Sequence, residues 1–491
     1  MRMRLSTQPA WRLLAAIAML ATVSGGIATG ARGAGTTQPA ATPGIGCDRG
    51  SLPEKTQGRA PKADYDSGRA AKGYFCNARR VSHFGKTGGY RVERYSDNAG
   101  HECAFYDSTL LFPTSVYNQV GGPDDPTTEG PGVYVLDMTR PAHPVHTDTL
   151  RTPAMQSPHE SLRLNQKRGL LVADMGYPTA NPGFVDVWSV KQDCRHPALQ
   201  SSTPMGILGH EGGFAPDGRT FYVASLYFHS LTAVDLTNPQ APVILWASFD
   251  YQPHGVSVSN DGKRLYIAEA AFDDNNGFSG LTVLDVSQIQ KRVTNPTVPI
   301  VSRLTWPEVS TPQNATPFVS RGHKYLLETD EFGSGASIGA ARIINIDNEK
   351  KPYVVSHLRL AVNQAKAQGA SLEADPGNDQ PFQGYQGHYC SLPSRVDPYI
   401  VACSFIMSGL RVFDIRNVRH PREVAYFNKP LIPGSDGVPT KAGAFAMSAP
   451  AYDGKTHDIW YTDGNTGFYV VRLTRASGVT KFARIVQYPG N

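Results

Sequence analysis

The sequence predicts an all-β protein: a seven-bladed β-propeller of four-stranded antiparallel blades, closed by an N-terminal strand. Three observations predict this fold. One strand motif recurs seven times, at intervals of about 45 to 65 residues, which is the range of propeller blades with loop insertions. Each copy stands within a series of short alternating strands and turns. The chain also contains 48 glycines and 37 prolines, as expected where many turns connect short strands.

The recurring strand ends in an acidic or polar residue and is followed by a turn that often contains proline. Its strong copies are 133–137, 231–235, 281–285, 342–347 and 410–414, and its weaker copies are 184–189 and 468–473. The full plan is clearest in the third repeat, with predicted strands at 210–214, 220–225, 230–236 and 243–249. Four antiparallel strands per repeat form one propeller blade.

Two further strand patterns, 78–84 and 90–95, precede the first full blade. We expect one of them to pair with the last blade, because this pairing closes the ring and removes an open sheet edge. The predicted organisation is a signal peptide at 1–34, an irregular N-terminal segment at 35–75 and the propeller at 76–491.

The N-terminus has the features of an export signal. Three arginines precede an apolar run at 13–27, and small residues follow where a signal peptidase would cut. The run is too short and too broken by glycine for a membrane span, and no later segment is long and apolar enough for one. We therefore expect an exported protein of the periplasm, cell surface or medium. Without the four arginines of residues 1–34, the net charge falls from +5 to +1, which gives no basis for binding nucleic acid or anionic membranes.

Six cysteines follow the predicted signal peptide. An even number in an oxidising compartment favours disulfides. Cys390 and Cys403 lie on successive predicted strands joined by a turn, so we expect them to pair. The other four, which allow three pairings that the sequence does not distinguish, are Cys47, Cys76, Cys103 and Cys194.

A histidine recurs near the start of five repeats: His101, His159, His210, His254 and His388. The phase is regular, because His210 and His254 each stand eight residues before a turn glycine. The same count gives Asn314 in the fifth repeat and Ala446 in the seventh. Since the first strand of a propeller blade is the innermost one, we expect all five histidines at one mouth of the central channel.

Converging neutral imidazoles are good ligands for copper, zinc, nickel or iron. Neighbouring residues of a strand point to opposite sides, so Glu102, Glu160 and Glu211 are expected between blades. There each orients an imidazole or pairs with a basic group of the next blade, and Asn314 completes this supporting set. Two other interpretations remain open: the histidines make a repeated structural hydrogen bond, or they line a metal-free site for a small molecule.

Other motifs are weaker candidates. Acidic residues at 273–277 and 124–125, and the run of Glu328, Asp330 and Glu331, offer oxygen atoms for calcium but lack the spacing of an EF-hand. Residues 335–339 match the nucleophile-elbow pattern around Ser337. Because that segment falls in a predicted loop between strands, we interpret it as a chance match.

The repeated Leu-x-Val-x-Asp-x-(Ser/Thr)-x-Pro strands, over residues 76–475, resemble the LVIVD-repeat family of exported bacterial proteins, which implies the fold and leaves the function open. Blades with a histidine on the first strand and Asp-Gly-x-x-(Leu/Phe)-Tyr-(Val/Ile)-Ala after it are similar, more distantly, to the selenium-binding protein and methanethiol oxidase family and to lactonase-like propellers. The methanethiol oxidase resemblance implies copper held by some of the channel histidines, as an analogy at the level of the fold.

Two functions are consistent with these observations. The first is an exported binding or scaffold protein, whose histidine-lined mouth takes a small molecule or an extracellular protein. The alternative is a metal-dependent oxidoreductase, with copper or zinc as the candidate metal, that acts on a small substrate in the channel, such as a sulfur-containing one.

Overall fold

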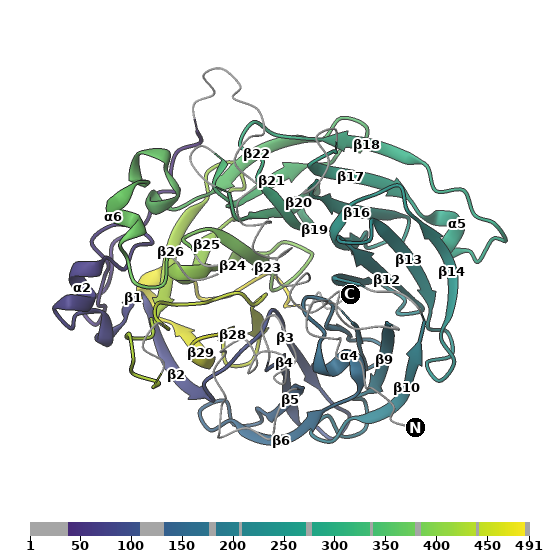
Figure 1. Ribbon diagram of the computed structural model, residues 1–491, viewed down its shortest axis with the longest axis horizontal. Helices are drawn as coiled ribbons and strands as arrows, with labels where there is room; N and C mark the ends of the chain where they lie inside the picture. The colour runs from purple at the N-terminus through teal and green to yellow at the C-terminus, as the bar shows by residue number, and fades with distance from the viewer. Residues whose placement is uncertain are drawn as a thin grey trace, which may run out of the picture.

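The computed structural model describes residues 38–108, 132–175, 183–205, 209–271, 277–333, 337–378, 384–437 and 441–486. Seven antiparallel sheets stand around a central axis (Figure 1). The predicted seven-bladed β-propeller is confirmed. Helices are short, and none in the described part of the chain has the length and apolar character needed to cross a membrane.

Each blade runs outward from an innermost strand, and the innermost strands of neighbouring blades contact one another around most of the ring. Blade 1 consists of β3 (Val92–Ser96), β4 (Glu102–Asp107), β5 (Val133–Asp137) and β6 (Val145–Leu150). Blade 2 consists of β7 (Arg163–Asn165), β8 (Leu170–Asp174), β9 (Phe184–Ser189) and β10 (Ala198–Pro204). Blade 3 consists of β11 (Glu211–Phe214), β12 (Thr220–Ser225), β13 (Ser230–Asp235) and β14 (Val243–Ser248). Blade 4 consists of β15 (Pro253–Val258), β16 (Arg264–Glu269), β17 (Gly280–Asp285) and β18 (Ile300–Leu304). Blade 5 consists of β19 (Thr311–Ser320), β20 (His323–Glu331), β21 (Ala341–Asn345) and β22 (Tyr353–Leu358).

The last two blades also include strands from the N-terminal part of the chain. Blade 6 consists of β23 (Gly387–Ser391), β24 (Ile400–Phe405), β25 (Gly409–Asp414), β26 (Arg422–Asn428) and β1 (Tyr74–Cys76), and blade 7 of β27 (Ala451–Asp453), β28 (Asp458–Asp463), β29 (Gly467–Leu473) and β2 (Ala78–Phe84). The strand β2 pairs antiparallel with β29 and closes the ring, so the predicted N-terminal closing strand is confirmed.

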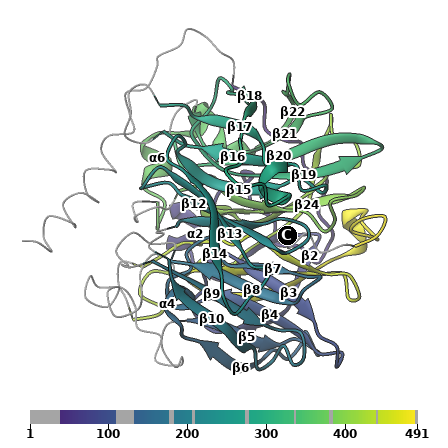
Figure 2. The same ribbon diagram turned by 90° about the vertical axis from the view of Figure 1, so that its right-hand side faces the viewer.

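Short helical segments connect the strands. They are α2 (Lys62–Asp66), η1 (Ala70–Lys72), α4 (Pro153–Gln156), α5 (Ser287–Gln290), η3 (Ala361–Asn363), η4 (Ala365–Ala367), α6 (Ala370–Glu373), η5 (Ile406–Ser408) and η6 (Arg475–Ser477). Both α4 and α6 precede an innermost strand, and both lie on the same side of the ring, at the left of Figure 2.

The recurring sequence motif is the third strand of every blade, from β5 in blade 1 to β29 in blade 7. The acidic residue at its end has a local role. Oδ1 of Asp137 accepts the backbone N–H two residues later at 2.8 Å, and Asp235 and Asp414 accept equivalent bonds. An aspartate that bonds its own backbone in this way ends the strand in a tight turn.

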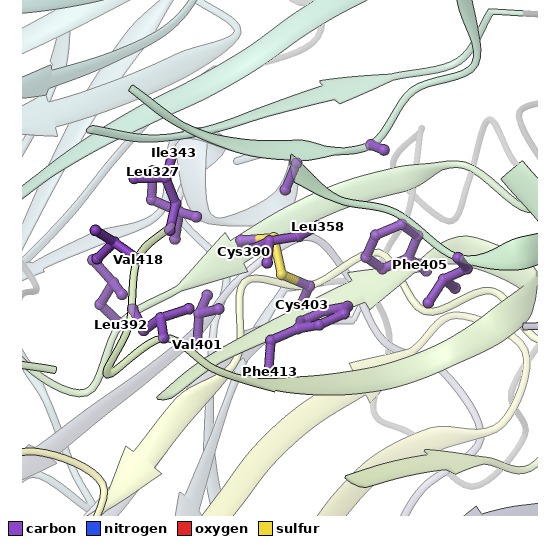
Figure 3. Close-up of a cluster of buried hydrophobic side chains, with 14 of the residues drawn as sticks. Leu327, Ile343, Leu358, Cys390, Leu392, Val401, Cys403, Phe405, Phe413 and Val418 are labelled. Carbon is purple, nitrogen blue, oxygen red and sulfur yellow. A yellow bond between two sulfur atoms is a disulfide. The ribbon is translucent and has the colours of Figure 1, made fainter. Parts of the chain in front are cut away.

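The apolar core is divided among the seven spaces between neighbouring blades, each with its own cluster of buried side chains. Between blades 5 and 6, Leu327 and Ile343 face Val401 and Phe413 (Figure 3). A blade therefore buries its two apolar faces only with a neighbour on each side. A further, smaller cluster, which includes Tyr90, Tyr389 and Met447, lies apart from these seven.

The first blade differs from the prediction. Its innermost strand is β3, which falls in the pattern read at 90–95, and the strand after His101 is the second strand, β4. His101 therefore lies in the turn between β3 and β4, not at the start of an innermost strand.

All six cysteines form disulfides: Cys390–Cys403, as predicted, with Cys47–Cys76 and Cys103–Cys194. Cys390–Cys403 joins two neighbouring strands of blade 6 and is visible within the cluster of Figure 3. Cys103–Cys194 joins blade 1 to the connection that follows β9. Three disulfides indicate that the chain folds in an oxidising compartment.

Loss of the Cys103–Cys194 disulfide is expected to destabilise the protein more than loss of Cys390–Cys403. The sequence separations are 91 and 13 residues. Chain entropy makes the stabilisation grow with the logarithm of the closed loop, which predicts a difference of about 1.7 kcal/mol. Urea unfolding of Cys103→Ser/Cys194→Ser and of Cys390→Ser/Cys403→Ser measures it, and equal losses in the two variants would contradict the expectation.

Candidate metal centre

Four of the five predicted histidines meet at one mouth of the channel. They lead into the innermost strands of blades 2, 3, 4 and 6, and they are His159, His210, His254 and His388. The ring centroids of His159 and His210 are 4.3 Å apart, and those of His210 and His254 are 4.7 Å apart. All four side chains are buried.

His101 does not join them. Its Nδ1 lies 2.8 Å from Asp97 Oδ2 and 3.7 Å from Asp193 Oδ1. Asp97 also accepts the backbone N–H of Cys194 at 2.9 Å, beside the Cys103–Cys194 disulfide. The three side chains are close enough to hold a cation, but their hydrogen bonds already account for the geometry as a braced turn.

Local bulges orient two of the imidazoles. His254 and His388 each occupy a position where the register with the second strand shifts by one residue. Nδ1 of His254 is 2.9 Å from the carbonyl oxygen of Pro312, and Nδ1 of His388 is 2.5 Å from that of Met447. A carbonyl only accepts hydrogen bonds, so both Nδ1 atoms carry protons. In the neutral ring Nε2 then presents a lone pair, the orientation common in metal-binding histidines.

The Nε2 atoms converge on the carboxylate of Glu160. The nearest oxygens of Glu160 are 3.1 Å from His388 Nε2, 3.4 Å from His210 Nε2 and 3.8 Å from His254 Nε2. Strand alternation predicted this glutamate between blades, and that prediction is wrong. His159 has a left-handed backbone, with φ +48°, so regular alternation fails there and Glu160 as well as His159 reaches the histidine cluster.

A second carboxylate, Glu331 at the end of β20, completes the group. Its Oε2 is 3.1 Å from His388 Nε2, and its Oε1 is 3.5 Å from His254 Nε2. Imidazole lone pairs and carboxylate oxygens thus face one another in a space shielded from water. Electron-rich atoms at these distances require a cation among them, either a proton or a metal ion.

Without a metal, a proton on His388 supplies that charge. Burial alone would lower the pKa of His388, but the Glu160 and Glu331 carboxylates outweigh burial and raise it to about 9. Burial lowers the pKa of His254 to about 3, and it holds the pKa of His159 well below the usual range. His254 and His159 are therefore neutral at physiological pH, which is the form that binds metals.

The spacing of the polar atoms fits a metal coordination sphere. Ligand atoms about 2.1 Å from a metal lie about 3 Å apart at right angles and about 4 Å apart across the ion. The five contacts between imidazole nitrogens and carboxylate oxygens span 3.1 to 3.8 Å. Two groups of three residues each bring one possible ligand atom per residue within 4.8 Å of the others in the same group. The groups are His159, Glu160 and His210, and Glu160, Glu331 and His388. Imidazole with carboxylate suits zinc, copper and iron.

Two tyrosines enclose the cluster. The Tyr90 ring stacks on His159 at 4.3 Å and lies 5.4 Å from the ring of His388. The hydroxyl of Tyr389 donates to Glu160 Oε2 at 3.0 Å. Both tyrosines are fully buried, so they keep water from two sides of the cluster and hold the central carboxylate in place.

The carboxylate of Glu211 ties together the innermost strands around the channel. Its Oε1 accepts bonds from Arg91 Nη2 at 2.6 Å, from Arg163, and from Asn314 Nδ2 at 2.7 Å. Arg91 also donates from Nε to the Glu160 carbonyl at 3.1 Å. Blades 1, 2, 3 and 5 therefore share one buried carboxylate, and this contact supports the backbone that carries Glu160.

Asn314 does not take the place of a histidine in blade 5. The bulged residue there is Gln313, between Pro312 and Asn314. Counting from the turn glycine missed it by one residue, because the bulge lies nine residues before Gly322 in blade 5 and eight before Gly262 in blade 4. In blade 7, Ala446 forms a bridge with Asp463 and offers no ligand atom.

Glu102 forms ion pairs with two basic side chains. It pairs with Arg94 at 2.5 Å and with Lys455 of blade 7 at 2.5 Å. A basic group of a neighbouring blade was one of the two partners expected for it. The contacts are structural, between blades 1 and 7.

One residue of the weaker motifs lies at the histidine cluster. Glu328 and Asp330 form ion pairs with the buried Arg342, which leaves Glu331 as the member of that acidic run at the histidine cluster. Ser337 lies in the loop between β20 and β21, as expected for a chance match. The acidic turns at 124–125 and 273–276 lie outside the described residues.

Comparisons with known proteins add no function. No protein-family model and no curated protein matches the sequence. Similar solved structures include a putative 6-phosphogluconolactonase from Bacteroides uniformis, with 13% identity, a TM-score of 0.45, and coverage of 74% of this chain and 96% of that one. A periplasmic gluconolactonase of Pseudomonas aeruginosa has 14% identity, a TM-score of 0.44, and coverage of 74% and 95%. A functionally unknown protein from Desulfotomaculum acetoxidans has 11% identity, a TM-score of 0.43, and coverage of 72% and 87%.

Gly255→Ala is expected to destabilise the fold by about 3 kcal/mol, the upper end for overpacking a buried position. A Cβ atom at Gly255 would lie 1.7 Å from Glu211 Oε2 and 2.1 Å from the Gln313 carbonyl oxygen. The matched control is Gly46→Ala, because nothing lies within 4 Å of that Cβ position. Urea unfolding compares the two variants, and a Gly255→Ala protein as stable as the control would refute the tight packing of this layer.

Proposed function

We propose that this protein is an exported enzyme with a transition-metal centre at one mouth of the propeller channel, and that it acts as an oxidoreductase on a small substrate. The proposed ligands come from His159, His210, His254, His388, Glu160 and Glu331. One observation carries the proposal: imidazole Nε2 atoms from three blades, two of them with Nδ1–H bound to a backbone carbonyl, converge on buried carboxylates. That geometry is typical of ligands held by a supporting shell.

A purely structural role explains the cluster less well. Structural histidines in a buried site normally give each ring nitrogen a hydrogen-bond partner. His210 is 3% exposed, and its Nδ1 has no such partner among the described residues. Its Nε2 lies 3.4 Å from Glu160 Oε2, a separation that suits two ligands of one ion better than a strong hydrogen bond.

The residues of the chain have separable tasks in this proposal. The carbonyl oxygens of Pro312 and Met447 fix the tautomers of His254 and His388. Tyr389 orients Glu160 through its hydroxyl, and Tyr90 shields the imidazoles from water. Bound copper or iron would supply one-electron chemistry, whereas zinc would supply Lewis acidity alone.

One observation favours the competing function, a metal-free binding or scaffold protein. His388 Nε2 lies 3.1 Å from both Glu160 and Glu331, and the attraction of the two carboxylates outweighs burial and raises the pKa of His388 to about 9, so a proton on His388 can bridge them without a metal. In that case the cluster would join blades 2, 4, 5 and 6 by hydrogen bonds, and a small molecule or an extracellular protein would bind elsewhere.

We also infer export to the periplasm, cell surface or medium. The inference rests on the basic and apolar N-terminal sequence and on the three disulfides, which persist in oxidising compartments.

Protein purified from its native compartment is expected to contain a stoichiometric transition metal. The double variant His210→Ala/His254→Ala should lose it, because at least two ligand atoms disappear. Saturating metal at about a thousand times its dissociation constant should stabilise the wild type by about 4 kcal/mol. Elemental analysis and thermal unfolding with and without a chelator measure both effects.

His101→Ala is the matched control for this experiment. His101 occupies the same sequence motif but lies in the β3–β4 turn with Asp97, so its loss should leave the metal content unchanged. Wild-type protein without metal, whose unfolding temperature does not respond to added copper, iron or zinc, would support the scaffold function instead.

A further inference from the structure

The central channel contains a cavity of about 100 Å³ that is partly open to solvent. Arg91, Arg163 and Asn314, which all donate to the Glu211 carboxylate, line this channel cavity. Its other lining residues also come from the innermost strands or from the segments beside them. None of the proposed metal ligands is among the described residues that line it. The channel cavity is therefore distinct from the histidine cluster, although both lie among the innermost strands.

Two buried guanidinium groups in this wall share one counter-ion. Arg91 and Arg163 both donate from Nη2 to a single carboxylate oxygen, Glu211 Oε1. Their Nε atoms donate to backbone carbonyls, of Glu160 and of Gly212. The remaining amino group, Nη1, has no hydrogen-bond partner within the described chain on either arginine. One positive charge is thus in excess over the carboxylate, and a buried charge of this kind is costly without an anion beside it.

The acidic residue of the wall, Glu93 on β3, does not supply that anion. Glu93 is 9% exposed, and in the described part of the chain it makes no hydrogen bond or ion pair. Burial raises the pKa of Glu93 to about 8, although the charge of Arg91 opposes the shift. At neutral pH the carboxyl group is therefore mostly protonated, and it can donate a hydrogen bond to a ligand in the cavity.

Size and polarity narrow the class of anion. An engineered apolar cavity of about 150 Å³ holds benzene, so a cavity of about 100 Å³ takes a smaller molecule. Val256, Leu392 and Ala451 place apolar side chains in the same wall as the arginines. A short monocarboxylate fits both features, because guanidinium groups bind its carboxylate and the apolar residues contact its alkyl group. Its single charge matches the excess on Arg91 and Arg163.

We propose that the channel cavity binds a small monocarboxylate anion, with Arg91 and Arg163 as its cationic partners and the Glu93 carboxyl group as a hydrogen-bond donor. This is a second ligand site in the channel, and it does not require a metal at the histidine cluster. Arg91 connects the two sites, because it also donates to the backbone carbonyl of Glu160.

Isothermal titration calorimetry of the full chain with sodium acetate, at constant ionic strength in sodium chloride, tests the proposal. Wild type should bind acetate saturably at neutral pH. Glu93→Leu removes the donor, and Arg163→Lys replaces the guanidinium group by one ammonium group, so each should weaken binding by about tenfold or more. Glu93→Gln keeps a donor and should retain binding within about threefold. Arg416→Gln removes an exposed arginine that pairs with Asp414, and it should leave acetate binding unchanged.

The pH dependence provides a readout specific to Glu93. As the pH rises through about 8, the wild-type carboxyl group loses its proton and repels the ligand, so acetate affinity should fall about tenfold by about pH 9. The Glu93→Gln variant should show no such fall. The other ionisable residues of the wall stay protonated over this range, and they are Arg91, Arg94, Arg163, Arg395 and Tyr452.

Three results would contradict the proposal. Wild type without saturable acetate binding, or binding that Glu93→Leu leaves unchanged, would overturn the site. Nitrate bound as tightly as acetate would overturn the assignment to carboxylates. The double variant His210→Ala/His254→Ala should lose the metal and keep acetate binding, so acetate binding that it abolishes would place the anion on the metal and overturn the channel cavity as its site. Thermal unfolding of each variant checks that the fold is intact.

Discussion

The centre of the ring depends on one buried negative charge, the carboxylate of Glu160. It lies within 3.1 to 3.8 Å of imidazoles from blades 3, 4 and 6. A buried carboxylate without a cation costs several kcal/mol, whereas one that is paired on several sides is tolerated. The left-handed turn at His159, the bulges at His254 and His388, and the hydroxyl of Tyr389 all serve to bring positive or neutral partners to this charge.

The propeller makes such a site possible because most of its apolar core lies between the blades. Each space between two blades is filled by its own cluster of buried side chains, so the axis can hold polar groups without weakening the fold. Glu211, Arg91 and Arg163 then hold the innermost strands in register around the channel. The absence of a side chain at Gly255 leaves room for the Glu211 carboxylate. The metal-binding hypothesis thus rests on a rigid frame that is built from many separate contacts.

The sequence was sufficient for the fold because the evidence for it is periodic. The third strand of each blade ends in a turn-forming residue, and this pattern located all seven blades. The closing strand was one of two extra strand patterns that precede the first blade, and β2 is the one that pairs with β29. Four of the five histidines were found in the same way. His101 was misplaced because a short strand, β3, preceded it and was not recognised as the start of blade 1. The turn at Asp97–Gly100 is equivalent to the turn at Gly218. The strand pattern before it, which begins with Tyr90, is therefore the place to look for the innermost strand of blade 1.

The remaining members of the site depend on irregular backbone that periodicity does not describe. Glu160 reaches the histidines only because His159 breaks the alternation of the strand. Glu331 belongs to an acidic run on β20, in which strand alternation puts it on the face opposite to Glu328 and Asp330, the two that pair with Arg342. Gln313 was missed by one residue because the bulge in β19 lies one residue further from the turn glycine than the bulge in β15. Sequence patterns identify the blades, and local departures from those patterns create the site.

The most direct test of the metal centre is X-ray absorption spectroscopy of the protein purified from its native compartment. A transition metal with three or four imidazole ligands and at least one carboxylate oxygen in its first shell is the predicted result, and the imidazole signal should fall in the Glu160→Gln and His254→Ala variants. Protein with no metal, or with a metal whose first shell contains no imidazole, would contradict the assignment of Glu160 and its surrounding histidines as a metal site.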